Sequence, residues 1–190
     1  MHFVISSGAQ KEPKTSIIVN ELKKIGYVVN TVNAEQEAKY ALKATIPPSF
    51  QENSFLVDIG SGNTKISWEE NGSLKAIEGV GAKYYDKNQS DAAVYNELKS
   101  RAVNIPESKR NVCFIIGGVP FTLAKQTRVG EERYTVLNEP GKYTAGTDKK
   151  TASGLNIYKA IADATNCDTF VFDWDSNFTI GFLLSLPVPQ

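Results

Sequence analysis

Apolar residues recur along this chain with two spacings, one typical of helices and one typical of buried strands. The helical spacing predicts helices over residues 14–25, 34–44, 90–103 and 151–165. Short apolar or alternating runs predict strands over residues 3–5, 27–32, 74–78, 111–116, 169–173 and 178–184, and a hairpin over 55–68. Because helices alternate with strands, we expect an α/β fold, a mixed sheet flanked by helices in a single domain over residues 1–190.

Two C-terminal regions are harder to interpret. Residues 126–150 are charged and rich in Gly and Lys, which predicts a mobile surface segment. The lysines 142, 149 and 150 in it could contact a polyanion, but a solvated loop is favoured because acidic residues lie among them. Asp173 and Asp175 could be paired metal ligands, although a hairpin end with an Asp-Ser-Asn turn is the favoured interpretation. Phe121 and Tyr158 are expected in the core.

Composition narrows the classes of protein that the pattern allows. The 21 basic residues equal the 21 acidic ones, so charge gives no reason to expect nucleic acid or an anionic membrane as a partner. Cys113 and Cys167 lie apart in apolar runs and are expected to be buried thiols. The single histidine, His2, excludes most zinc sites and histidine-dependent triads. Without a signal peptide or a long apolar span, a cytoplasmic setting is expected.

A glycine-rich turn interrupts the predicted hairpin. The strand ends at Asp58-Ile59, and the turn Gly60-Ser61-Gly62-Asn63-Thr64 leads into the returning strand. Glycines let a ligand approach the backbone, with positive φ available at Gly60 and Gly62, and successive N–H groups in such a turn form a concavity for anions. A carboxylate at a strand end, here Asp58, suits Mg²⁺ accompanied by substrate phosphates. An ordinary hairpin turn rich in Gly and Asn is the alternative.

Two further motifs accompany this loop. Glu37 lies in the first part of the helix predicted after the strand 27–32, in the run Glu35-Gln36-Glu37-Ala38. Gly117 and Gly118 follow a continuous apolar strand and precede a helix start, which is a second plausible anion site. Considered alone, Glu37 is better interpreted as a solvated helix residue.

The order of these motifs resembles the second half of the exopolyphosphatase/guanosine pentaphosphate phosphohydrolase (Ppx/GppA) family. This family belongs to the superfamily of actin, Hsp70 and sugar kinases, whose domains are ribonuclease H-like. The resemblance is strongest over residues 3–125. Its most specific part is a Glu-x-Glu-Ala helix followed about twenty residues later by an Asp-Ile-Gly-x-Gly-x-Thr loop.

The resemblance implies a reaction and roles for these residues. The reaction is Mg²⁺-assisted hydrolysis of a phosphoanhydride in polyphosphate or guanosine pentaphosphate. Glu37 matches the general base and Asp58 the metal anchor. The phosphate cradle corresponds to Gly60, Ser61, Gly62, Asn63, Thr64, Gly117 and Gly118.

The sequence also departs from the family pattern. Ser61 and Asn63 stand where the family has glycine and serine, and Val119-Pro120 follows the second glycine pair in place of a threonine. Only one Asp-x-Gly loop is present, whereas the family places phosphates between two related domains. We therefore expect an excised half; the alternatives are a natural single-domain relative and a site completed by a partner or a second copy. Little turnover is expected from the domain alone.

Three rival functions stay open at this stage. The loop also resembles those of small-molecule kinases in the same superfamily. Val119-Pro120 is compatible with a degenerate module that binds phosphate or nucleotide without hydrolysis. A purely structural hairpin would bind no phosphate at all.

Overall fold

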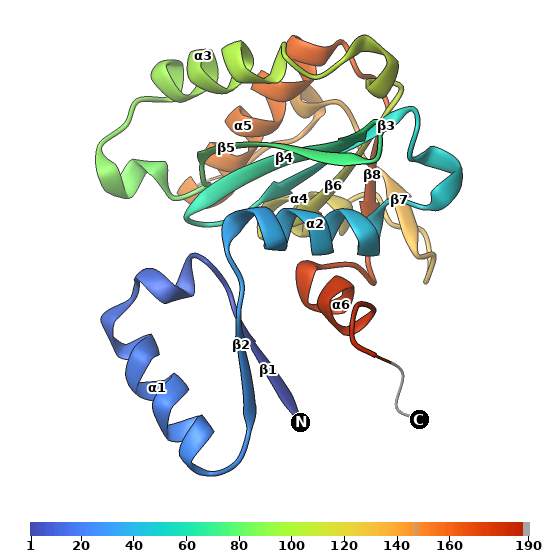
Figure 1. Cartoon of the computed structure of the whole chain (residues 1–190). Helices are drawn as coiled ribbons and strands as arrows, with labels where there is room; N and C mark the ends of the chain where they lie inside the picture. Colours follow the sequence, from blue (N-terminus) through green and yellow to red (C-terminus); the bar gives the residue numbers. More distant parts are fainter. Residues whose placement is uncertain (147, 188–190) are drawn as a thin grey trace.

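A six-stranded mixed sheet forms the centre of the computed structural model, which describes residues 1–146 and 148–187 (Figure 1). The strand order is β5-β4-β3-β6-β8-β7, where β3, β6 and β8 are mutually parallel and the other three strands pair in antiparallel fashion. Their bounds are β3 Ser54–Ile59, β4 Asn63–Glu70, β5 Ser73–Val80, β6 Val112–Gly117, β7 Tyr134–Val136 and β8 Phe170–Asp173. The predicted fold class is confirmed.

Helices cover both faces of this sheet (Figure 1). On one face lie α2 (Ala34–Thr45) and α6 (Phe178–Leu183), and a small apolar cluster joins α2 to Leu56, Phe114 and Ile116. The larger cluster, on the other face, involves α3 (Asp91–Ala102), α4 (Gly118–Ala124) and α5 (Lys149–Thr165). Since successive strand residues point to opposite faces, Asp58 shares the α2 face with Leu56.

Residues 2–31 form a smaller unit beside the sheet. The parallel strands β1 (His2–Ile5) and β2 (Val28–Thr31) are joined by α1 (Pro13–Lys24), which buries none of its residues (Figure 1). Short 3₁₀ turns complete the fold at Ala9–Lys11, Pro48–Phe50, Tyr84–Lys87, Glu107–Lys109 and Pro140–Lys142.

The start of α2 is fixed by a capping box. The side chain of Asn33 accepts from Gln36 N at 2.8 Å, and Gln36 Oε1 accepts from Asn33 N at 2.9 Å. Such reciprocal bonds satisfy two N–H groups that a helix start leaves free. They set the rotation of the first turn, which turns Glu37 toward the protein rather than toward solvent.

Two sequence predictions for the C-terminal part are wrong. The segment 126–150 contains a strand, β7, which pairs with β8 at the sheet edge, and only its middle residue, Thr135, is buried. Residues 178–183 form α6 and not a strand, and Asn177 caps the helix by accepting from Ile180 N at 3.0 Å. A short apolar run such as 178–184 is compatible with either a helix or a strand, so the sequence pattern alone does not distinguish the two.

The packing of α6 explains its conformation. A Cβ on Gly181 would lie 1.8 Å from Tyr40 O, so glycine allows α6 to approach α2 closely.

Asp173, upstream of α6, is buried and accepts from Arg133 Nε and Nη2 at 3.1 and 3.0 Å. Asp173 is therefore neither an exposed hairpin end nor a free metal ligand.

Of the remaining predictions for single residues, three are confirmed and one is wrong. Cys113 and Cys167 are buried free thiols, and Tyr158 lies in the core, as predicted. Phe121 does not, because 40% of its surface is exposed. Within residues 1–146 and 148–187, no helix has the length and apolar character needed to cross a membrane.

Candidate phosphate site

The two glycine motifs meet at one edge of the sheet. β3 and β6 are parallel neighbours, with Asp58 opposite Ile116 and Ile59 opposite Gly117. Loops that follow the carboxyl ends of adjacent parallel strands lie side by side, which is where ligands bind in open α/β sheets. The topology thus brings together two motifs that are far apart in the sequence.

The loop after β3 is held by main-chain hydrogen bonds. Gly60 N donates to Asn63 O at 3.0 Å, and the Gly60 and Ser61 carbonyls accept from Ala82 N at 2.9 Å and Lys83 N at 3.0 Å. The N–H groups of Ser61 and Gly62 donate to no protein acceptor in the described part of the chain. Adjacent free N–H groups of this kind are what an anion site requires.

The predicted positive φ at the two glycines of this loop is not observed. Neither Gly60 nor Gly62 has a positive φ. The close approach is made instead at Gly81, where a Cβ would lie 2.4 Å from Asn63 N and 2.6 Å from Ser61 O. Gly81 is a residue that the sequence analysis missed, because its role depends on a contact between the segment just after β5 and the loop.

Gly117 needs to be glycine for two reasons. Its φ is 113°, and a Cβ there would lie 2.3 Å from Ile59 O. The next residues explain the departure from the family pattern, because Val119 and Pro120 are buried and Val119 packs against Gly154 of α5. The positions that the family pattern gives to a hydroxyl here contribute to the core.

Lys150 lies beside the second glycine loop. It stands in the first turn of α5, partly buried, with its Nζ 3.5 Å from the position that a Cβ of Gly118 would take. The fold therefore brings a cation to the site from residues that the sequence analysis assigned to a solvated loop.

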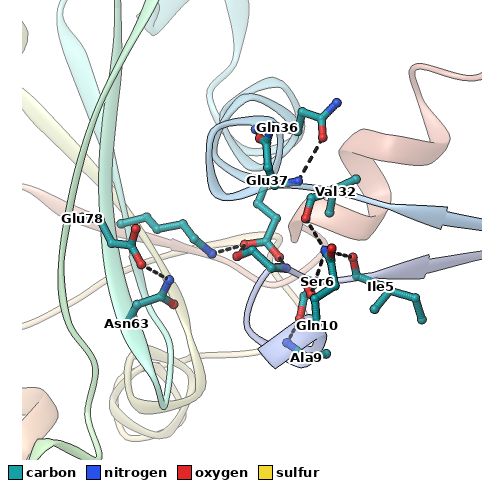
Figure 2. Close-up of polar contacts among 12 residues, drawn as sticks. Ile5, Ser6, Ala9, Gln10, Val32, Gln36, Glu37, Asn63 and Glu78 are labelled. Carbon is teal, nitrogen blue, oxygen red and sulfur yellow. Dashed lines mark hydrogen bonds and ion pairs between the residues drawn. The ribbon is translucent and has the colours of Figure 1, made fainter. Parts of the chain in front are cut away.

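Glu37 projects from α2 into a network of donors (Figure 2). Its carboxylate is only 2% exposed, and it accepts from Ser7 N at 2.7 Å and Ser7 Oγ at 2.9 Å. It also forms an ion pair with the ammonium of Lys65. The interpretation of Glu37 as a solvated helix residue is wrong.

The loop after β1 is itself anchored, which fixes the position of Ser7. Gln10 N donates to Ser6 O at 3.0 Å, and Gln10 Nε2 donates to Val32 O at 2.8 Å (Figure 2). These bonds connect the ends of β1 and β2 to the start of α2. Sequence reasoning did not identify Ser7, because its partner Glu37 is thirty residues away.

Lys65 is the most informative residue that sequence reasoning missed. It directly follows the glycine-loop motif and lies opposite Asp58 in the β3–β4 register. Burial raises the pKa of Asp58 to about 6; the positive charge of Lys65 opposes this shift, and the negative charge of Glu37 adds to it. Asp58 is thus predominantly ionised at neutral pH, although its ionised form is less favourable than in water.

Two other predicted cradle residues have their side chains elsewhere. Thr64 is fully buried on the face opposite Asp58 and Lys65, and its hydroxyl has no partner among the described residues. Asn63 Nδ2 donates to Glu78 Oε1 at 2.7 Å (Figure 2). The groups of this loop that remain free for an anion are therefore main-chain N–H groups rather than these side chains.

The carboxylates do not form an evident metal centre. Within the described residues, no three His, Cys, Asp or Glu side chains gather in a way that could hold a metal ion. Glu37 is already neutralised by Lys65. Asp58 lies opposite the same ammonium, so neither carboxylate presents an uncompensated charge to the Mg²⁺ that the family resemblance implies.

Comparison with solved structures identifies the fold. A Ppx/GppA family member from Aquifex aeolicus superposes with a TM-score of 0.71 at 17% identity, covering 96% of this chain and 72% of that one. An exopolyphosphatase from Cytophaga hutchinsonii gives 0.75 at 11% identity, with 96% and 73% covered. No family model matches the sequence, and no curated protein matches it.

The chain therefore has the actin-like fold of the Ppx/GppA structures, as the motifs predicted. The structural match covers 96% of the chain and so continues well beyond residue 125, where the sequence resemblance weakens.

Proposed function

We propose that this chain is a phosphohydrolase-like domain that binds the end of a phosphate chain, of the polyphosphate or guanosine pentaphosphate type. The single observation that supports this most strongly is the buried carboxylate of Glu37 in a site built on the Asp58–Thr64 motif, next to a second glycine loop. The exopolyphosphatase from C. hutchinsonii, with the same fold, is named for such a substrate.

Each part of the site has a role in this proposal. The free N–H groups of Ser61 and Gly62, with the ammonium of Lys150, hold phosphoryl oxygens. A carboxylate offers about four lone-pair positions. Three of them are taken on Glu37, which leaves one to orient a water molecule.

The proposed reaction is water attack on the terminal phosphorus. The water oxygen forms the new P–O bond, and the bond to the bridging oxygen breaks, with its electrons passing to the shortened chain. The water proton passes to Glu37 and then to solvent. Catalysis of this kind depends mostly on positioning and on charge stabilisation at the phosphoryl oxygens.

Binding without hydrolysis is the second candidate, and a specific observation favours it. Ser7 and Lys65 occupy three of the roughly four lone-pair positions of the Glu37 carboxylate, so little of it remains to contact a water molecule. The side chains of Val119 and Pro120 also supply no hydroxyl at the second loop.

A paired assay separates the two candidates. The chain is incubated with tripolyphosphate, long-chain polyphosphate or guanosine pentaphosphate, and released phosphate and calorimetric binding are followed in parallel. We expect saturable binding with slow phosphate release. Binding with no release at high protein concentration would favour the second candidate, and the absence of binding to all three would exclude both.

A further inference from the structure

The ion pair between Lys65 and Glu37 has an unusual setting. Lys65 extends from β4, is 12% exposed, and faces α2 together with its cross-strand partner Asp58. Directly opposite residues in an antiparallel pair have Cβ atoms about 5 Å apart. One ammonium therefore acts on two carboxylates, contacting Glu37 and facing Asp58.

The oxygens of Glu37 are already engaged. Oε1 accepts from Ser7 N, and Oε2 accepts from Ser7 Oγ and from Lys65. A divalent ion that approaches Oε2 would have to displace the ammonium, and one that approaches the remaining lone pair on Oε1 would be repelled by the positive charge bound to the same carboxylate. Of the two carboxylates, Asp58 alone would remain as a ligand, opposite the same ammonium.

We propose that Lys65 is a built-in cation that takes the place of a divalent metal ion at this site, so that phosphate chains bind without metal. That the ligand is a phosphate chain rests on the proposed function. The exclusion of the metal follows from the contacts of Lys65 alone. Lys150, beside Gly118, provides a second positive charge for the phosphoryl oxygens.

Manganese binding tests the metal exclusion without reference to activity. Free Mn²⁺, a spectroscopic substitute for Mg²⁺, is titrated with the wild-type chain, Lys65→Met and Lys65→Arg, and followed by electron paramagnetic resonance. We expect no binding at this site in wild type or Lys65→Arg. Lys65→Met leaves two uncompensated carboxylates, and we expect it to bind Mn²⁺ at least about tenfold more tightly than the weakest binding that the titration detects. The double variant Lys65→Met with Asp58→Asn should lose this gain.

Thermal unfolding provides a second readout. Added Mn²⁺ should raise the melting temperature of Lys65→Met and leave that of wild type unchanged, because a ligand that binds the folded state stabilises it. If Lys65→Met does not fold, the wild-type titration still decides. Saturable Mn²⁺ binding by wild type that Asp58→Asn abolishes would overturn the inference, and so would a folded Lys65→Met variant that gains no affinity.

Tripolyphosphate binding separates this inference from the proposed function. If wild type binds tripolyphosphate with equal affinity in EDTA and in Mg²⁺, both the metal-free binding and the proposed function are supported. Binding that requires Mg²⁺ would overturn the inference and leave the function standing. An absence of binding in both buffers would overturn the function and the metal-free binding, while the Mn²⁺ titration would still decide whether Lys65 excludes the metal.

Discussion

Replacing Gly117 by alanine is expected to lower the free energy of unfolding by about 4 kcal/mol, the sum of backbone strain and forced overpacking. The backbone at Gly117 has φ 113°, where L-residues are strained. A Cβ would also lie 2.3 Å from Ile59 O and 2.8 Å from Ile59 C. Both neighbours are main-chain atoms of the adjacent parallel strand, so relief requires β3 and β6 to separate.

Gly62→Ala is the matched control for this substitution. Gly62 lies in the other loop of the site, has no positive φ, and no atom lies within 4 Å of its Cβ position. Its free energy of unfolding should change by about 0.5 kcal/mol or less. Urea unfolding of both variants measures the difference. Equal stabilities would mean that the strand ends at Gly117 are not packed as described.

Replacing Glu37 by glutamine is expected to reduce phosphate release by about 10²- to 10⁴-fold, the range for loss of a general base. Glutamine has nearly the same shape, and its one carbonyl oxygen can still accept at the position of Oε2, from Ser7 Oγ and Lys65, or at that of Oε1, from Ser7 N. It cannot take a proton from water. Tripolyphosphate affinity should stay within a few-fold of wild type, because the phosphate contacts proposed here lie on other residues.

Glu35→Gln is the corresponding control, because Glu35 is exposed on the same helix, two residues earlier. It should release phosphate at the wild-type rate. Far-UV circular dichroism of both variants checks that α2 is intact. A Glu37→Gln variant as active as wild type would remove Glu37 from the mechanism, even if phosphate binding persisted.

The sequence predicted what depends on neighbouring residues. The hairpin β3–β4 and the helix α2 are indicated by local alternation and by helical spacing of apolar residues. The strand 55–59 and its loop were therefore identified from local pattern, whereas Glu37 was singled out only by the resemblance to the Ppx/GppA family. The face on which Asp58 lies also follows from strand alternation alone.

What the sequence did not predict depends on contacts between distant segments. Gly81 is needed because the loop of β3 passes close to it, and Ser7 matters because α2 turns Glu37 toward it. The ion pair of Lys65 joins α2 to β4. The helix α6 was mistaken for a strand because a short apolar run fits both structures, and the close contact of Gly181 with Tyr40 of α2 is not visible in the sequence.

The most direct test of the phosphate site is an amide chemical-shift titration of the ¹⁵N-labelled chain with tripolyphosphate in EDTA. We expect saturable shifts to be largest at the N–H groups of Ser61, Gly62 and Gly118, which line the two glycine loops. Shifts centred on the exposed lysines of other surfaces, or no shifts at all, would contradict the proposal that these loops bind a phosphate chain.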